Sequence, residues 1–201
     1  MIKPDVSRRR FVSALPLTVL ATPSVLSGCE AVEGGAEENS PPPVLQAQSQ
    51  GPGFIGPYSE EEAGAVAASP MAQEIAALNG QGYPCSEMIL LAALRRFELG
   101  ENHLDAAAVF GGGVGKRDLC GLLTGGLMAI GFAAGNRYTD RQQVHQVGRT
   151  ASNAYWDWWV GRGDLHCMGY GTAHENSDEF VRMCQRTAVK LESVLTEIVG
   201  V

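Results

Sequence analysis

The 201-residue sequence lacks the short motifs of several common protein chemistries. It contains no CxxC pair, so no thioredoxin-like pair or zinc ribbon is encoded locally, and no CxxCH motif for covalent haem attachment. HExxH, GxSxG and phosphate-loop motifs are also missing. A glycine run at residues 110–115 reads FGGGVG, but no strand pattern precedes it, which excludes a dinucleotide-binding fingerprint.

Charged and aromatic residues are also scarce. They make up 18% and 7% of the chain, against 45% hydrophobic residues, a composition that fits a globular protein with a real core. The formal net charge is −7, and it becomes −10 if the N-terminal 28 residues, which carry a net +3, are removed. A chain with this negative charge repels polyanions, so we expect no nucleic-acid partner.

The first 28 residues are expected to be an export signal. The consecutive arginines Arg8, Arg9 and Arg10 precede Phe11 and a short apolar run, which resembles a twin-arginine signal peptide. The run ends in LSGC at residues 26–29, which resembles a bacterial lipobox, in which the cysteine is lipidated and becomes the new N-terminus. We predict a periplasmic or cell-surface protein anchored in the membrane through Cys29. The alternative is an ordinary cleavage site with an incidental cysteine.

The remaining chain divides into a tether and a folded domain. Residues 29–57 contain several Glu and Gln, a triple proline and a Gly-Pro-Gly turn, and such a composition buries too little apolar surface to fold. We predict a flexible tether over residues 29–57 and a helical four-cysteine domain over residues 58–201.

Helix signals follow one another along the domain, and no segment shows the sustained alternation of a β-strand. A capping box at Ser59 and Glu62 predicts a helix that Ser69-Pro70 interrupts and that ends near Leu78. We therefore predict an all-α fold, a compact bundle of five or six helices with a glycine-rich loop before the central apolar helix. Further helices are expected from Pro84-Cys85, over residues 102–109, from Asp118, from Thr139 with Gln142 to about Trp159, and from Asn176 with Glu179 onward.

The central helix lies in the apolar run of residues 119–134. This run carries no charge, but its 16 residues are fewer than the roughly 20 that span a bilayer, so a buried helix is expected. Gly121 and Gly125 lie four residues apart on one face, where another helix could approach closely. The aromatic group Tyr155, Trp156, Trp158 and Trp159 is expected to anchor the core, with a partner-docking surface as the alternative.

Four cysteines fall inside the predicted domain: Cys85, Cys120, Cys167 and Cys184. With Asp118 as N-cap, Cys120 would lie in a first helical turn, where the helix dipole, Lys116 and Arg117 favour a thiolate. Cys184 lies on an apolar stripe of the last helix and is expected in the core. In an oxidising compartment four cysteines most often form two disulfides, while four thiolates could also bind a metal or an iron–sulfur cluster.

The arrangement of these cysteines resembles a known family. A cysteine at a helix start, the FGGGVG run, CGLLTG at residues 120–125 and two later cysteines resemble the C_GCAxxG_C_C family of redox-active proteins over residues 83–199. The resemblance implies redox activity on Cys85, Cys120, Cys167 and Cys184. It also implies an iron–sulfur cluster, [2Fe–2S] in type, on these cysteines, and a redox protein or membrane oxidoreductase as partner.

Two alternatives to a cluster remain. One is a metal-free thiol–disulfide redox protein in which Cys85 and Cys120 react, and the other is a structural lipoprotein with two disulfides. Four histidines are also present, His103, His145, His166 and His174, and single histidines usually have structural or solvated roles. Only His166, beside Cys167, is placed to ligate a metal or tune a thiolate.

Overall fold

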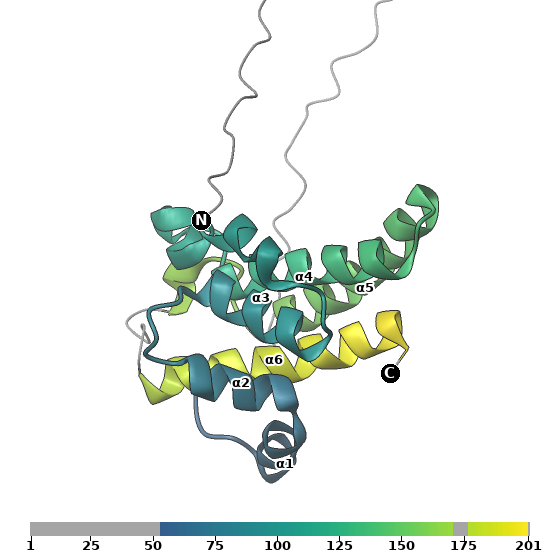
Figure 1. The fold of residues 1–201 in the computed structure, drawn as a ribbon. Helices are drawn as coiled ribbons and strands as arrows, with labels where there is room; N and C mark the ends of the chain where they lie inside the picture. Colours follow the sequence, from purple (N-terminus) through teal and green to yellow (C-terminus); the bar gives the residue numbers. More distant parts are fainter. Residues whose placement is uncertain (1–52, 171–176, 201) are drawn as a thin grey trace, which may run out of the picture. The chain divides into compact units, whose positions relative to one another are not determined.

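The computed structural model describes residues 53–170 and 177–200. The predicted signal peptide, Cys29 and most of the predicted tether lie outside these residues, as do His174 and Asn176. Six α-helices and three shorter helical turns are present in the described parts of the chain: α1 (Glu60–Ala68), α2 (Pro70–Leu78), α3 (Cys85–Arg96), η1 (Glu101–Ala107), η2 (Gly113–Arg117), α4 (Gly121–Arg137), α5 (Arg141–Val160), η3 (Cys167–Tyr170) and α6 (Asp178–Val199). The predicted all-α bundle is confirmed (Figure 1).

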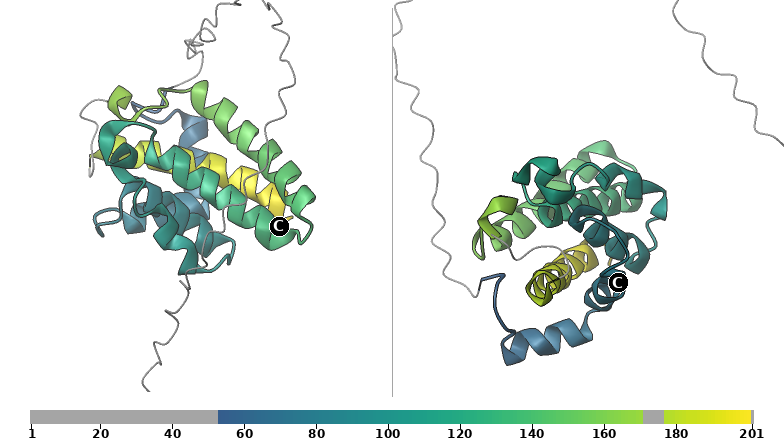
Figure 2. Two further views of the ribbon diagram at one scale, coloured as in Figure 1. Left: turned by 90° about the horizontal axis from the view of Figure 1, so that it is seen from above. Right: turned by 90° about the vertical axis from the view of Figure 1, so that its left-hand side faces the viewer.

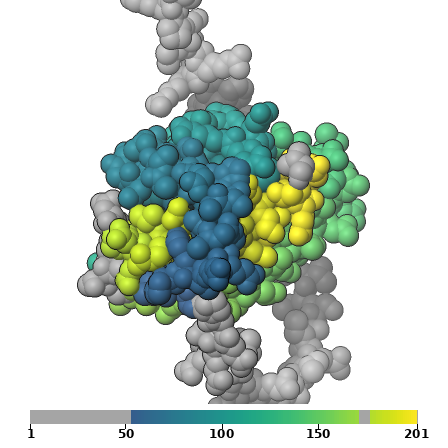
Figure 3. Space-filling view, turned by 90° about the horizontal axis from the view of Figure 1, so that it is seen from below, coloured from purple at the N-terminus to yellow at the C-terminus, as the bar shows by residue number. Residues whose placement is uncertain are grey.

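Helix α6 runs through the middle of the bundle and contacts each of α1 to α5. The end-on view in Figure 2 shows α6 with the other helices around it. Figure 3 shows α1 and α2 crossing α6, both ends of which are visible beside them. The sequence places α6 there because its apolar stripe is long, and Cys184, Ala188, Leu191 and Leu195 are all fully buried.

Most of the helices begin where the capping signals predict. Ser59 accepts a hydrogen bond from the backbone N–H of Glu62, whose carboxylate accepts one from Ser59 in return. Ser69 caps α2, with Pro70 as its first residue. Two caps differ by one residue, because Asp140 rather than Thr139 caps α5 and Ser177 rather than Asn176 caps α6. In each helix the side chain of the observed cap, Asp140 or Ser177, accepts a hydrogen bond from the backbone N–H three residues further along the chain.

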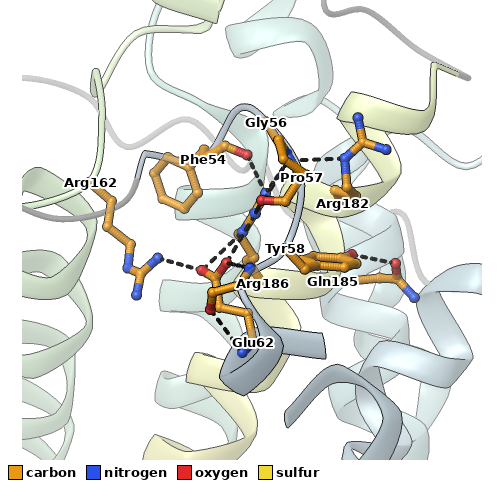
Figure 4. Close-up of polar contacts among 10 residues, drawn as sticks. Phe54, Gly56, Pro57, Tyr58, Glu62, Arg162, Arg182, Gln185 and Arg186 are labelled. Atoms are coloured by element: carbon orange, nitrogen blue, oxygen red, sulfur yellow. Dashed lines mark hydrogen bonds and ion pairs between the residues drawn. The ribbon is translucent and has the colours of Figure 1, made fainter. Parts of the chain in front are cut away.

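The domain starts earlier than residue 58. Phe54 is buried and packs against Trp159, with their ring centroids 4.5 Å apart. The guanidinium of Arg186 donates hydrogen bonds to the carbonyls of Phe54, Gly56 and Pro57 (Figure 4). The glycines and prolines of residues 53–57 predict a tether, but a buried aromatic ring and two arginines, Arg186 and Arg182, hold this segment on the bundle.

The central helix α4 is buried, as its apolar sequence predicts, and it packs closely on α3, α5 and α6. Among the helices of the described residues, none combines the length and hydropathy of a membrane span. The aromatic group anchors the core as expected, since Tyr155 and Trp159 are fully buried. Tyr155 donates a hydrogen bond of 3.0 Å to the carbonyl of Leu122 and so fixes α5 against the start of α4.

Candidate functional site

Two of the four cysteines mark the beginnings of two helices that pack together. Cys85 is the first residue of α3, as predicted, and Cys120 is the N-cap of α4. The predicted close approach at the glycines is confirmed. A Cβ atom at Gly121 would stand 2.4 Å from the Cys85 sulfur, and one at Gly125 would stand 2.4 Å from the Ser86 carbonyl oxygen. The glycines of α4 therefore let the start of α3 come against the residue that follows Cys120.

The prediction that Asp118 caps the central helix is wrong. Asp118 follows the η2 turn, and the chain stays extended for two more residues, so that Cys120 itself takes the cap position. A backbone ladder explains this difference, because Leu119 pairs with His166 in an isolated antiparallel bridge. A residue held in such a bridge cannot be in a helical turn.

The same bridge brings Cys167 to the site. The N–H of Cys120 donates to the carbonyl of Leu165 at 2.8 Å, and the N–H of Cys167 donates to the carbonyl of Asp118 at 2.7 Å. In an antiparallel ladder of this pattern, Cys120 and Cys167 are diagonal neighbours on one face of the paired segments. Two cysteines 47 positions apart in the sequence are thus neighbours in space.

The glycine-rich loop makes room for these approaches. Gly112 and Gly113 have φ of +60° and +63°, which favour glycine, as predicted for turns in this run. A Cβ at Gly113 would stand 2.9 Å from the Cβ of Cys167, and one at Gly111 would stand 2.4 Å from the Cβ of Pro84. The loop therefore packs on one side against the residue before Cys85 and on the other against Cys167.

Cys184 completes the set from α6. It is fully buried, as the stripe predicts, while Cys120 is 5% exposed and Cys85 and Cys167 are half-buried. Burial raises the pKa of Cys184, and the charge of a thiolate at Cys85 or at Cys120 raises it further. Contacts at the starts of α3 and α4 and the backbone bridge thus place Cys85, Cys120 and Cys167 near one another, and Cys184 lies within the electrostatic influence of Cys85 and Cys120.

Cys120 does not behave as an activated thiol. Burial raises the pKa of Cys120 from its ordinary value near 9 to about 12, and the neighbouring sulfurs of Cys85 and Cys167 also act to raise it. The N–H groups of Leu122 and Leu123 lower the pKa, as the helix start predicts, but burial outweighs them. Lys116 and Arg117 are exposed. The prediction that the position of Cys120 favours a thiolate is therefore wrong, because burial favours the protonated thiol.

The metal-binding potential of the site rests on its sulfur donors. Within residues 53–170 and 177–200, no group of three or more His, Cys, Asp or Glu side chains is arranged to hold a metal ion. Four cysteines remain the right kind of ligand for an iron–sulfur cluster. As they stand, however, the sulfurs form a set of neighbours and not a closed ligand shell.

His166 lies at the edge of the site and is exposed. Its Nε2 is 3.3 Å from a carboxylate oxygen of Asp118, and its Nδ1 is 3.1 Å from one of Asp164. These two exposed carboxylates hold the imidazole ring at the surface of the site. His103 stacks on Phe132, with ring centroids 4.4 Å apart, and His145 is exposed on α5.

Several residues that shape the site were not expected from the sequence. Asp164 organises the segment before Cys167, because its carbonyl accepts hydrogen bonds from Trp159 and Tyr170 and its carboxylate accepts from the N–H of His166. Tyr83 and Phe180 line a cavity beside Cys85. The only sequence signal for these roles is the position of Tyr83 and Asp164 two or three residues before a cysteine.

The fold and this site define a helical protein built around four neighbouring cysteines. Residues 83–198 match the model of the family described as "Putative redox-active protein (C_GCAxxG_C_C)". The match covers more than half of the sequence, and the chain belongs to this family. No curated protein and no solved structure matches the chain.

Proposed function

We propose that this chain is an exported redox protein in which Cys85 and Cys120 cycle between a dithiol and a disulfide. The observation that carries the proposal is the contact of the Cys85 sulfur with the position of Gly121, the residue directly after Cys120. A disulfide requires Cβ atoms about 4 Å apart, and two helix starts that meet at a glycine are suited to this approach. Membership of a redox-active family supports the same chemistry.

The other cysteine pairs support a disulfide less well. Cys120 and Cys167 are ladder diagonals, for which a separation of about 7–8 Å is usual, so joining them would require the bridge to open. Cys184 is fully buried on α6, so a disulfide to it would be shielded from an external redox partner and would suit a structural role. Cys85 is half-buried and lies against the residue after Cys120, which makes Cys85 and Cys120 the best pair.

The reaction of this pair balances simply. Oxidation joins the two sulfurs and releases two protons and two electrons, which a disulfide or another two-electron acceptor takes up. Reduction by a dithiol partner reverses the step. Both cysteines lie at helix starts, Cys85 as the first residue of α3 and Cys120 as the N-cap of α4.

An iron–sulfur cluster on Cys85, Cys120, Cys167 and Cys184 is the second candidate. Its supporting observation is the diagonal placement of Cys120 and Cys167, which is too wide for a disulfide yet leaves both sulfurs on one face. Burial raises the pKa of both Cys120 and Cys184, so thiolates there need a compensating positive charge, which iron provides. When bound, a [2Fe–2S] cluster would supply one-electron transfer.

The proposed location follows from the N-terminus. A twin-arginine signal over residues 1–28 and lipidation at Cys29 would place the domain outside the cytoplasm on a membrane-anchored tether. The lipid anchor would keep it near a membrane oxidoreductase or another exported redox protein. Export through the folded-protein route is compatible with either chemistry.

One preparation distinguishes the candidates. The full chain is purified anaerobically after native export, and iron, acid-labile sulfide and the visible spectrum are measured before thiol trapping and mass spectrometry across a redox titration. The proposal expects a colourless protein with one reversible Cys85–Cys120 disulfide. Substitution by serine at Cys85 or Cys120 should abolish the couple, and Cys167→Ser should retain it.

Each other outcome overturns the proposal in favour of a named alternative. Iron, sulfide and a visible spectrum that all four single serine variants lose would indicate the cluster. Two disulfides that resist reduction in the folded chain would indicate a structural lipoprotein.

A further inference from the structure

A cavity of about 250 Å³ opens beside Cys85, on the side away from the helix interior. Its walls come from the loop before α3, from α3 itself and from the start of α6: Gly80, Gly82, Tyr83, Pro84, Met88 and Phe180, with Cys85 among them. None of these side chains is charged. Cys85 thus lies at a helix start, beside an uncharged cavity, with the position of Gly121 and then Cys120 on its α4 side.

The rim of this cavity is open because glycines form part of it. Gly80 and Gly82 have φ of +80° and +88°, and a Cβ at either would meet no atom within 4 Å. On the opposite side, Phe180 lies in the first turn of α6, and its side chain is half-buried. A group that enters between them meets Cys85, the side chains of Tyr83, Met88 and Phe180, and the glycine backbone.

The size and lining of the cavity restrict what enters. Its volume lies below the range of about 300–1,000 Å³ that is typical of small-molecule and cofactor sites, so it suits part of a partner chain. Uncharged walls disfavour anionic small thiols, and the negative net charge of the chain acts in the same direction. The chemistry that fits is a cysteine flanked by uncharged groups.

We propose that this cavity receives a disulfide of a partner protein that is flanked by uncharged residues, and that Cys85 is the cysteine that forms the mixed disulfide with it. This inference rests on the proposed Cys85–Cys120 couple. Cys85 as thiolate attacks one sulfur of the partner's disulfide, and the other sulfur leaves and takes up a proton. Cys120 then loses its proton and attacks the Cys85 sulfur, which forms the internal disulfide and releases the partner's second thiol. Two electrons pass from this chain to the partner.

Two aromatic disulfides of different charge test the cavity on the reduced full-length chain. Dithiodipyridine is neutral, and dithiobisnitrobenzoate carries two carboxylates. After each rate is divided by the rate for the urea-unfolded chain, the neutral probe should react faster at Cys85 by about tenfold, a discrimination of about 1.4 kcal/mol. Mass spectrometry of the trapped adducts assigns the reacting cysteine.

Three variants show whether the walls cause this preference. Phe180→Ala removes one wall and should lower the rate of the neutral probe, whereas Phe132→Ala, a half-buried phenylalanine of α4 stacked on His103, should leave it unchanged. Tyr83→Lys keeps the cavity and adds a positive charge, and it should raise the rate of the dianionic probe selectively. Unfolding curves of all variants verify the fold.

The two proposals fail in different ways. The cavity assignment is overturned if Cys167 reacts first, or if Phe180→Ala and Tyr83→Lys change the two rates no more than Phe132→Ala. A normal Cys85–Cys120 couple in those samples would leave the proposed function intact. Conversely, loss of the couple with preserved probe preference at Cys85 would overturn the proposed function alone.

Discussion

Gly121 lies directly against Cys85, and the space of one missing Cβ atom separates the starts of α3 and α4. A Cβ at Gly121 would stand 2.4 Å from the Cys85 sulfur, 3.0 Å from the Phe110 carbonyl oxygen and 3.1 Å from the Ser86 nitrogen. The last two are backbone atoms, so rotation of one side chain cannot relieve the overlap. This glycine therefore sets the distance between the two helix starts that hold the proposed redox pair.

Gly121→Ala should separate these helix starts and disturb the couple. Overpacking of this kind costs about 1–3 kcal/mol, which urea unfolding of the reduced protein would measure. The Cys85–Cys120 disulfide should form more slowly in the same variant, as thiol trapping would show.

Gly131→Ala is the matched control for this change. Gly131 lies in the same helix and is exposed, and a Cβ atom added there would meet no atom within 4 Å. Its replacement should stabilise α4 by up to about 1 kcal/mol, because alanine favours helix more than glycine does. Equal stability changes at the two glycines would show that the close contact has no energetic role.

How far the sequence predicts this site depends on the range of each interaction. The stripe of the last helix predicts the burial of Cys184, and the spacing of Gly121 and Gly125 predicts the approach of α3, because both patterns are local to one helix. The bridge between Leu119 and His166 pairs backbone segments far apart in the chain and has no repeating pattern, so the cap at Cys120 and the place of Cys167 could not be predicted.

The pKa of Cys120 shows a second reason why the sequence does not predict the whole site. A helix start and nearby cations predict a low pKa for Cys120, but the sequence does not reveal how completely Leu122, Leu123 and the rest of the core enclose the sulfur. Phe54 is a similar case, since its segment has a tether-like composition, but its buried ring and hydrogen bonds from Arg186 and Arg182 hold it in place. Burial by distant elements decides both outcomes.

The raised pKa of Cys120 predicts a loss of stability in alkali. The pKa of this thiol is about 12 in the folded state and about 9 in the unfolded state. The free energy of unfolding is therefore unaffected by this thiol below pH 9 and falls as the pH rises from 9 toward 12. At about pH 10.5 the unfolded state gains about 2 kcal/mol from ionisation of this thiol. Urea unfolding in the presence of a phosphine reductant would measure the decline.

Cys120→Ala should remove that part of the alkaline decline. Other buried acids also titrate in alkali, because burial raises the pKa of Tyr155 and Cys184 as well, so the difference between variant and parent is the informative quantity. Cys167→Ala, at a half-buried position, serves as comparison. Parallel curves for the parent and Cys120→Ala would contradict the prediction.

The lowered pKa of Glu62 predicts a loss of stability in acid rather than in alkali. Burial alone would raise its pKa, but hydrogen bonds from Arg186, from the N–H of Ser59 and from Arg162 outweigh it and lower the pKa from 4.5 to about 2 (Figure 4). The resulting stabilisation, on the order of 3 kcal/mol, is present above about pH 4.5 and is lost as the pH falls toward 2. Glu62→Gln should therefore lower stability at neutral pH and flatten the acid limb.

Glu60→Gln is the control for Glu62. Glu60 is exposed in the same first turn of α1, so its replacement should change the free energy of unfolding by no more than about 0.5 kcal/mol. Chemical unfolding of both variants between neutral and acidic pH would measure the two curves. An unchanged acid limb in Glu62→Gln would mean that the buried Arg186 is satisfied by the backbone carbonyls of the N-terminal segment alone.

A substitution at Cys29 separates the role of the proposed lipid anchor from that of the redox domain. Cys29 precedes the described residues and, in the proposed function, carries the lipid. Cys29→Ser should leave the fold and the Cys85–Cys120 couple intact but release the protein from the membrane fraction, because the serine cannot carry the proposed lipid and the remaining chain is acidic. The release follows from the loss of the proposed lipid alone. Fractionation, with mass analysis of the new N-terminus, would test this, and Cys167→Ser should remain in the membrane fraction. If Cys29→Ser stays membrane-bound after its signal peptide has been shown to be removed, the lipid anchor is wrong, and another feature must hold the domain at the membrane.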